Sequence, residues 1–338
     1  MFVQATWHIC TAIRMKHAFP HEWQIENKYK AHNLFDHTVY YLRHPLTNRV
    51  VRWNSRDHRK GKIAKIVNYG SLPRHSIHYQ YIQISNISWW VSVLFTLGSI
   101  WWLFNGIFIF HLPLPNISDN MQVGAYFGLA GGITFLLGGY AMYLEALNIS
   151  NRNILGHHQQ LLHANSCSTE EDNLLDHKSY QWRWYGNGDF KDLGYTAAVL
   201  QFIGTIIFGI GPITGIPNVL PDQSSDPNYS ALWIVLYWLP QVIGATFLTL
   251  SSYCIMIETQ SHWYKIRPFS SIGWHVGFWN IIGSVGFLMS GAFGCALPGF
   301  ENVIFIYGVA LTTYIGSYAF LLGSVLQYLE LIKTSKVK

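Results

Sequence analysis

Six long apolar blocks restrict what this 338-residue chain can fold into. They cover residues 88–111, 122–144, 193–217, 231–257, 272–296 and 302–329. Each block exceeds the roughly 20 residues that a helix needs to cross about 30 Å of hydrocarbon. Backbone groups that face lipid must be paired within the protein, so we expect each block to be a helix. The sequence therefore predicts an all-α integral membrane protein with six transmembrane helices.

The basic residues of the chain lie on only one side of the predicted helices. All 22 Lys and Arg fall in residues 1–87, 148–191, 259–271 and 331–338, whereas the three other loops carry acids only. Because loops rich in Lys and Arg stay in the cytoplasm, this distribution predicts that both termini are cytoplasmic, an N-in/C-in topology.

This topology divides the chain into seven segments. They are a basic cytoplasmic N-terminal region (1–87), a first hairpin (88–147), a cytoplasmic loop (148–191), a second hairpin (192–258), a short cytoplasmic loop (259–271), a third hairpin (272–331) and a cytoplasmic tail (332–338).

The second, fourth and sixth helices share one pattern of small residues. Residues 135–145, FLLGGYAMYLE, and 320–330, FLLGSVLQYLE, are identical at seven of eleven positions. The three helices align on their final glutamates, Glu145, Glu258 and Glu330. Small residues stand seven and fourteen positions earlier: Gly138, Ser251, Gly323, Gly131, Gly244 and Gly316. A spacing of seven returns to nearly the same helix face, so we expect these positions to let helices pack closely.

The first, third and fifth helices have a pattern of their own. They align on Gly98, Gly204 and Gly283, each followed four residues later by an aromatic residue: Trp102, Phe208 and Phe287. The segments that lead into the third and fifth helices, WYGNGDFKDLGY (184–195) and WYKIRPFSSIGW (263–274), also share an aliphatic residue followed by glycine. The predicted unit is therefore a two-helix hairpin used three times, as parallel repeats about an axis along the membrane normal.

The hairpin resembles a known family. The segments FTLGSIWWLF, NIIGSVGFLMSG and FLLGSVLQYLE are similar to the YrhK-like small membrane domain, over about 180 of the 338 residues. This resemblance implies a multi-pass membrane architecture and supplies no catalytic residues.

The three terminal glutamates need a physical reason, because the C-terminal end of a helix disfavours an anion. One interpretation is structural: each carboxylate accepts hydrogen bonds from a basic or indole donor in a cytoplasmic segment, for example Arg183, Lys265 or Trp263. A second is a ring of acids at a cation-selective mouth. A third is solvation at the membrane interface.

Other polar groups within the helices are few: Asn105, Gln201, Gln241, His275, Asn280 and Gln327. We expect most of them to form hydrogen bonds between helices. The histidine-rich fragments 75–78 and 157–163 have no matching partners, so we expect no metal site. No nucleophile–base pair, HExxH motif or phosphate-binding glycine loop is present in the sequence, so we expect no catalytic residues, no cofactor and no enzymatic activity.

The basic run RWNSRDHRKGKIAKI (52–66) precedes the first helix, and we expect it to contact anionic lipid headgroups rather than nucleic acid. The sequence points to no particular protein partner. The function that it favours is a non-enzymatic membrane scaffold, sensor or lipid-organising protein. The alternative is a pathway for a small solute or cation along the pseudo-threefold axis.

Overall fold

The computed structural model describes residues 24–29, 32–36, 38–43, 50–60, 65–67, 75–79, 81–110, 117–148, 182–221, 229–260, 262–264, 271–296 and 306–337. Within these residues six helices are long and apolar enough to cross a membrane, which confirms the number predicted from the sequence. The candidate spans are Ile87–Ile109, Gln122–Leu147, Leu193–Thr214, Ala231–Glu258, Ile272–Ala296 and Tyr307–Ile332.

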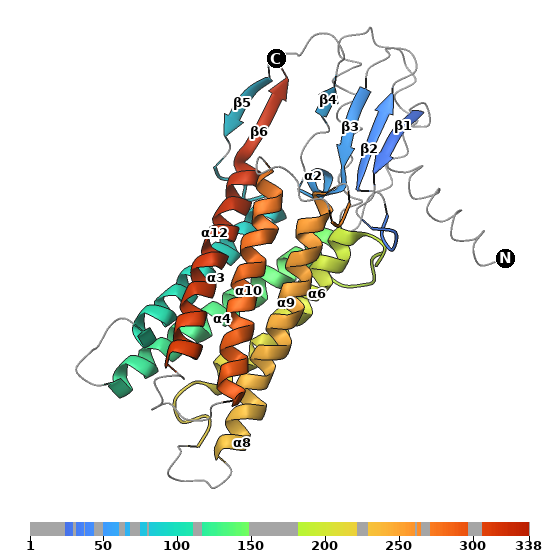
Figure 1. Cartoon of the computed structure of the whole chain (residues 1–338). Helices are drawn as coiled ribbons and strands as arrows, with labels where there is room; N and C mark the ends of the chain where they lie inside the picture. Colours follow the sequence, from blue (N-terminus) through green and yellow to red (C-terminus); the bar gives the residue numbers. More distant parts are fainter. Residues whose placement is uncertain are drawn as a thin grey trace, which may run out of the picture.

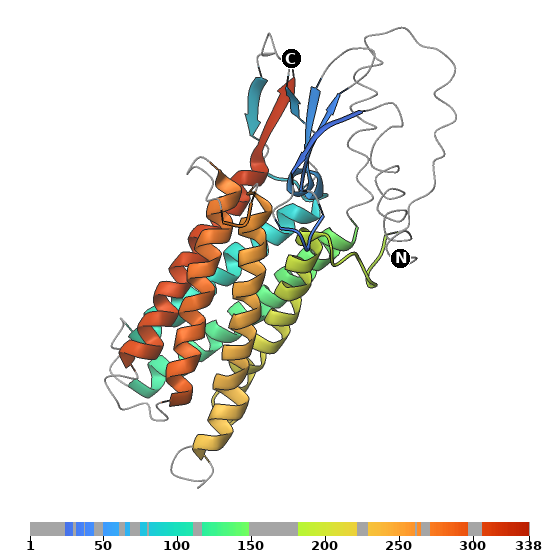
Figure 2. The same cartoon turned by 45° about the vertical axis from the view of Figure 1, so that its right-hand side comes forward.

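The six main helices form a closed ring in chain order. They are α3 (Ile87–Phe110), α4 (Ile117–Leu147), α6 (Leu193–Phe208), α9 (Leu239–Glu258), α10 (Ile272–Ala296) and α12 (Thr312–Ile332). Each packs against the next along the chain, and α12 packs against α3 to close the ring. The resulting bundle can be followed in Figure 1 and, turned by 45°, in Figure 2.

Shorter helical segments extend the spans: α7 (Ile210–Thr214), α8 (Tyr229–Trp233), and the π-helical segments η3 (Ile234–Trp238) and η4 (Ile306–Leu311). The irregular turn η3 has a local cause in Pro240, which has no N–H to donate to the carbonyl oxygen of Leu236 four residues earlier. The hydroxyl of Thr214 donates to that oxygen instead, at 2.8 Å. The irregular backbone is therefore compensated by the neighbouring helix.

Strands lie at one end of the bundle, and the expectation of an all-α protein is wrong in this respect. An antiparallel sheet has the order β1 (Gln24–Tyr29), β2 (Val39–Arg43), β3 (Val50–Asn54) and β4 (Lys65–Val67). β2 and β3 are rich in β-branched and aromatic residues, VYYLR and VVRWN, which suit a half-buried pleated surface. The predicted N-terminal region thus contains a small folded unit.

A second pair of strands joins the two ends of the helical ring. β5 (His75–Tyr79) precedes α3, and β6 (Lys333–Val337) follows α12; the two pair antiparallel. Figure 1 shows this pair and the four-stranded sheet at the same end of the bundle. The described chain therefore enters and leaves the bundle at one end.

Three aromatic rings fill the centre of the bundle. Trp102, Phe208 and Phe287 are buried and contact one another pairwise edge to face, with ring centroids 4.9–5.4 Å apart. They come from α3, α6 and α10, at the aligned position four residues after the glycine of each helix. Phe320 packs against Phe287, and Phe135 packs against Phe320. Aromatic side chains therefore occupy the axis at this depth.

The small residues aligned by the sequence lie at close contacts between helices. A Cβ atom at Gly131 would stand 2.6 Å from the ring of Trp102, and one at Gly244 would stand 2.6 Å from the backbone of Phe208. Such distances are too short for a side chain, so a larger residue would separate each helix pair.

The other aligned small residues meet similar neighbours: Gly98 meets Phe135, Gly138 meets Phe95, Gly204 meets Leu248, Gly283 meets Phe320, Gly316 meets Phe287 and Gly323 meets Asn280. Ser251 instead donates to the carbonyl oxygen of Ala197 at 2.7 Å. In every case the contact is with the other helix of the same hairpin.

Candidate functional site

The three aligned glutamates end their helices at the strand-bearing end of the bundle, where Glu145 and Glu258 are buried and Glu330 is partly buried. The side chain of Glu258 is 0% exposed. A buried carboxylate is stable only when charged or hydrogen-bonding groups surround it, so its partners define the site.

The partners come from one short helix, α2 (Ser55–Arg59), which follows directly after β3. Asn54 caps it by accepting a hydrogen bond from the backbone N–H of Arg56 at 2.9 Å. Arg56, Arg59 and Lys60 are all buried, an unusual state for basic side chains. Because they are three and four residues apart, the three project from one face of a helical turn.

Arg59 binds Glu258 through two parallel hydrogen bonds. Its Nη1 and Nη2 donate to Oε1 and Oε2 at 2.8 and 2.7 Å. The hydroxyl of Ser55 also donates to Oε1 of Glu258, at 3.1 Å. The planar guanidinium matches the carboxylate, which makes this arrangement both strong and specific in direction.

Arg56 binds Glu330 in the same two-point way. Its Nε and Nη2 donate to Oε1 and Oε2 at 3.0 and 2.9 Å, and Lys60 Nζ donates to Oε2 as well. Nη1 of Arg56 also lies 3.7 Å from Oε2 of Glu258, so Arg56 connects the Arg59–Glu258 pair with its own pair to Glu330. We call these five side chains, Arg56, Arg59, Lys60, Glu258 and Glu330, the latch.

Two glycines leave room for the arginines. A Cβ atom at Gly194 would overlap Nη1 of Arg59, and one at Gly273 would stand 3.0 Å from Nε of Arg56. Both glycines lie ten residues before the aligned glycine of their helix, in the aliphatic–glycine pair that the two leading segments share.

The first hairpin has Ser88 at this position, and here the buried glutamate finds its donor in a different way. The hydroxyl of Ser88 donates directly to Oε1 of Glu145 at 2.6 Å. Glu145 is therefore bound within its own hairpin, and among the described residues no guanidinium contacts it.

Electrostatics keeps the two arginines charged. Burial lowers the pKa of a guanidinium, but the charges of Glu330 and Glu258 more than offset this effect and raise the pKa of Arg56 above its ordinary value. In Arg59 the charges of Glu258, Glu145 and Asp192 likewise outweigh burial, and the pKa is raised. Each arginine is therefore a permanent cation.

Asp192 caps α6 beside the latch and accepts from the N–H groups of Gly194 and Tyr195 at 2.8 and 3.1 Å. Burial raises the pKa of Asp192 above its usual range, against the opposing effects of Arg59 and these two hydrogen bonds. Its ionised form is thus less favourable than in water.

The donors differ from those suggested by the sequence. Arg183 donates to the carbonyl oxygen of Asn187, and Lys265 lies outside the described residues. The observed donors belong to the segment 52–66, for which lipid contact was expected. Its Arg56, Arg59 and Lys60 are buried in the latch, while lipid contact by the rest of the segment stays a prediction.

The described residues contain no group of three or more His, Cys, Asp or Glu side chains placed to hold a metal ion, and the histidines of 157–163 lie outside them. Both latch carboxylates accept hydrogen bonds from arginines of α2, so the latch joins α2 to α9 and to α12.

Six apolar helices of this length are compatible with a multi-pass membrane protein. No family model, curated protein sequence or solved structure matches the chain. The geometry of the described residues therefore carries the functional argument.

Proposed function

We propose that the protein is a non-enzymatic membrane scaffold whose helical bundle holds the cytoplasmic β1–β4 sheet in a fixed orientation at the membrane surface. The observation that carries this proposal is the latch. Two arginines on one turn of α2 select carboxylates on two different helices, α9 and α12. Such two-point contacts fix both position and rotation, which a surface ion pair does not do.

The proposal includes cytoplasmic placement of both termini. Support comes from the basic segments of the sequence and from the position of all described strands at one end of the bundle. Single cysteines at positions 228 and 334 test it in sealed vesicles with a membrane-impermeant thiol reagent. Each cysteine is introduced alone into a background in which the native reactive cysteines are replaced. We expect label at the two positions from opposite sides, whereas labelling of both from the same side would contradict the topology.

The proposal also includes three parallel two-helix repeats. Support comes from the aligned residues: Trp102, Phe208 and Phe287 meet at one centre, and each aligned glycine contacts its own hairpin partner. An experimental structure in which Glu145, Glu258 and Glu330 lie at clearly different membrane depths would contradict the repeat. The resemblance to YrhK-like domains stays a prediction.

A solute or cation pathway along the axis is the weaker candidate. A pathway needs a continuous opening, and the rings of Trp102, Phe208 and Phe287 are in mutual contact on the axis. A cation-selective mouth needs free carboxylates, whereas Glu258 and Glu330 are bound by arginines. The lipid bilayer is the partner that this proposal requires.

Hydrogen–deuterium exchange on the full-length protein in lipid nanodiscs tests the scaffold. In the double variant Glu258→Gln, Glu330→Gln, we expect the amides of α2 and the adjoining β3 to exchange at least about ten times faster, because buried ion pairs of this kind resist opening. Exchange in α10 should not change. The variant Arg43→Met, which breaks an exposed pair with Glu26, is the matched control and should leave α2 protected.

Flux measurements on proteoliposomes test the alternative, a pathway for small cations or solutes. If the wild-type protein conducts small cations or solutes well above empty liposomes, and the double glutamate variant changes that flux without releasing the sheet, the pathway replaces the scaffold as the function.

A further inference from the structure

The segment that leads into α6, residues 182–190, exposes a cluster of aromatic side chains. Trp182, Trp184, Tyr185 and Phe190 are 42, 61, 85 and 59% exposed. Surfaces that face water rarely carry a large apolar patch without a partner. Figure 2 shows this segment, at the start of the yellow-green part of the chain, standing out from the flank of the bundle below the strands. We call it the aromatic loop.

The aromatic loop has a defined shape and is tied to the end of α4. The side chain of Asn148 accepts from the N–H of Arg183 at 2.9 Å and donates to its carbonyl oxygen at 2.8 Å. Nη2 of Arg183 donates to the carbonyl oxygen of Asn187 at 3.1 Å. Gly186 has a φ angle of +136°, which only glycine adopts readily, and a Cβ atom there would stand 2.5 Å from Nη2 of Arg183.

Two tyrosines of α4 set the depth of the aromatic loop. The hydroxyl of Tyr140 donates to the carbonyl oxygen of Trp184 at 3.0 Å, and that of Tyr143 donates to the carbonyl oxygen of Gly186 at 2.5 Å. These tyrosines precede Glu145 by five and two residues, or about 8 and 3 Å along the helix. Helical side chains lean toward the N-terminus, which in α4 is the end far from the strands. The loop therefore turns back along α4, past the buried glutamate and toward the bundle centre.

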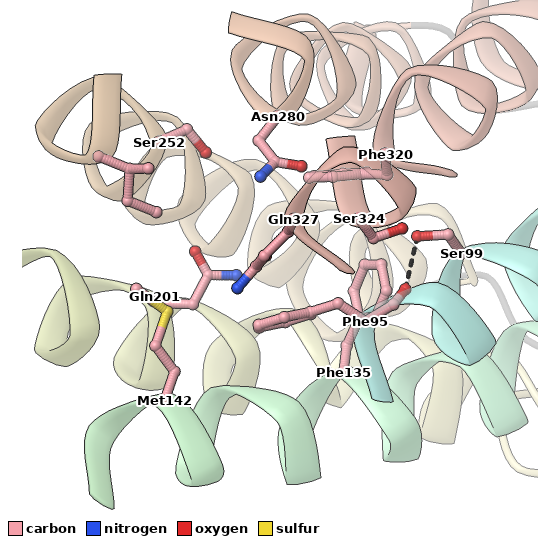
Figure 3. Close-up of a pocket in the computed structure, with 11 residues that line it drawn as sticks. Phe95, Ser99, Phe135, Met142, Gln201, Ser252, Asn280, Phe320, Ser324 and Gln327 are labelled. Carbon is pink, nitrogen blue, oxygen red and sulfur yellow. Dashed lines mark hydrogen bonds between the residues drawn. The ribbon is translucent and has the colours of Figure 1, made fainter. Parts of the chain in front are cut away.

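The interior of the bundle shows what surrounds α4 at this level. Met142, which lies between the two tyrosines in the sequence, lines a small internal cavity with Gln201 and Gln327. Figure 3 shows the carboxamides of these two residues turned toward each other inside the bundle. Polar groups at this level thus point inward, whereas Leu137 on α4 is 50% exposed, as expected of a surface that faces lipid.

The chemistry of the aromatic loop fits the boundary between headgroups and acyl chains. Indole and phenol rings combine an apolar body with a polar end, and they concentrate at this boundary. The headgroup layer is about 5–8 Å thick, comparable with the distance by which the loop turns back along α4. Arg183 is exposed in the same loop, and its single side-chain bond, to Asn187, leaves further N–H groups to bind a lipid phosphate.

We propose that the aromatic loop enters the bilayer as far as the headgroup boundary and anchors the strand-bearing end of the bundle to phospholipids. Trp184 and Tyr185 contact the boundary of the acyl chains, and Arg183 binds phosphate oxygens. A protein partner would have to displace lipid from the flank of α4 to reach the same surface. The inference rests on the proposed function only in requiring that the bundle crosses a membrane, and it does not depend on the latch.

Spin labels at three exposed positions test the depth in full-length protein reconstituted into nanodiscs of phosphatidylcholine and phosphatidylglycerol. Tyr185→Cys reports on the aromatic loop, Ile25→Cys on the β1–β4 sheet and Leu137→Cys on the outer face of α4, each in a background without reactive native cysteines. Power saturation measures the accessibility of each label to oxygen, which concentrates in lipid, and to a water-soluble nickel complex. We expect the oxygen-to-nickel ratio at position 185 to be severalfold higher than at position 25 and lower than at position 137.

Tyrosine variants test the attachment to α4. The double variant Tyr140→Phe, Tyr143→Phe removes the hydroxyls that bind the loop but keeps both rings. We expect the label at position 185 to become more mobile and its oxygen-to-nickel ratio to fall toward that of position 25. Tyr253→Phe is the matched control, because Tyr253 stands at the equivalent position of α9 and, among the described residues, its hydroxyl makes no bond to the loop; it should change neither quantity.

Three results would overturn the proposal. If position 185 is as accessible to nickel as position 25 while position 137 is lipid-like, the loop lies in water. If position 185 is shielded from both reagents, another protein, such as a second copy of this chain, covers it. If the double tyrosine variant leaves both mobility and depth unchanged, α4 does not hold the loop. A water-like label at position 137 would instead refute the membrane bundle itself, so failure of the loop proposal and failure of the proposed function can be told apart.

Discussion

Removing the carboxylate of Glu258 should be among the most damaging single changes in the protein. This side chain is 0% exposed and accepts two hydrogen bonds from Arg59 and one from Ser55. Breaking a buried pair leaves the partner charged and unsolvated, at a cost of about 3–5 kcal/mol. We expect Glu258→Gln near the lower value, because the amide keeps one acceptor oxygen, and Glu258→Leu near the upper.

The double variant Arg59→Met, Glu258→Leu should cost much less than the two single changes together. Removing both charges leaves apolar groups of similar size, which is often close to neutral in stability. The interaction energy from the double-mutant cycle should therefore be at least about 2 kcal/mol. Arg56 keeps Glu330 in this variant, so the rest of the latch remains paired.

Reversible unfolding of the full-length protein in mixed micelles, followed by tryptophan fluorescence, measures these differences. The exposed pair of Arg43 with Glu26 is the control, because its side chains are 38% and 32% exposed and such pairs contribute about 0–1 kcal/mol. If Glu258→Leu costs no more than Arg43→Met, or if the double variant costs the full sum of the single ones, the latch does not hold the structure as argued.

Three further predictions follow from the surroundings of the latch. Gly194→Ala should destabilise the wild-type protein because its Cβ displaces Arg59, but it should have little effect in an Arg59→Ala background, as the same unfolding measurement will show. Ser88→Ala should cost about 1.5–3 kcal/mol by leaving Glu145 without its hydroxyl donor, and an equal stability of both proteins would contradict the assignment. Asp192→Ala should cost about 1 kcal/mol by loss of the helix cap, whereas Asp192→Asn should be neutral or slightly stabilising. Burial raises the folded-state pKa of Asp192, so its ionisation lowers the stability of the folded protein at pH values above that pKa. As the pH falls through the pKa, the carboxyl is protonated and this loss of stability disappears. Any advantage of Asp192→Asn should therefore vanish toward acidic pH.

The six helices of the bundle could be predicted well, because the signals that define them lie within short stretches of sequence. Uninterrupted apolar length fixes the helices, and regular spacing of small residues marks the faces that touch, as Gly131 and Gly244 illustrate. The alignment also placed Trp102, Phe208 and Phe287 at one position of the predicted repeat. That these rings meet on the axis could not be derived from spacing, because the rotation of each helix about its own axis depends on all of its neighbours at once.

The sequence suggested basic partners for the glutamates but carried no signal for which residues these partners are. Arg56 and Glu330 are 274 residues apart, and α2 is only five residues long, too short for a helical periodicity to be visible. The basic character of 52–66 was equally consistent with lipid contact. The one available signal was the shared aliphatic–glycine pair before the third and fifth helices, which places Gly194 and Gly273 beneath the arginines.

A buried ion pair is a poor way to gain net stability, since well-packed apolar side chains often stabilise as much or more. The latch therefore needs a different explanation, and its geometry offers specificity of position. An apolar α2 could slide or rotate on the end of the bundle, whereas two guanidiniums three residues apart fit only two carboxylates at one separation and orientation. The carboxylates belong to the second and third hairpins, and the first hairpin carries Ser88 where the other two have glycine. The hydroxyl of Ser88 already donates to Glu145, whereas Glu258 and Glu330 accept from Arg59 and Arg56. In the described residues, α2 is therefore held against the second and third hairpins.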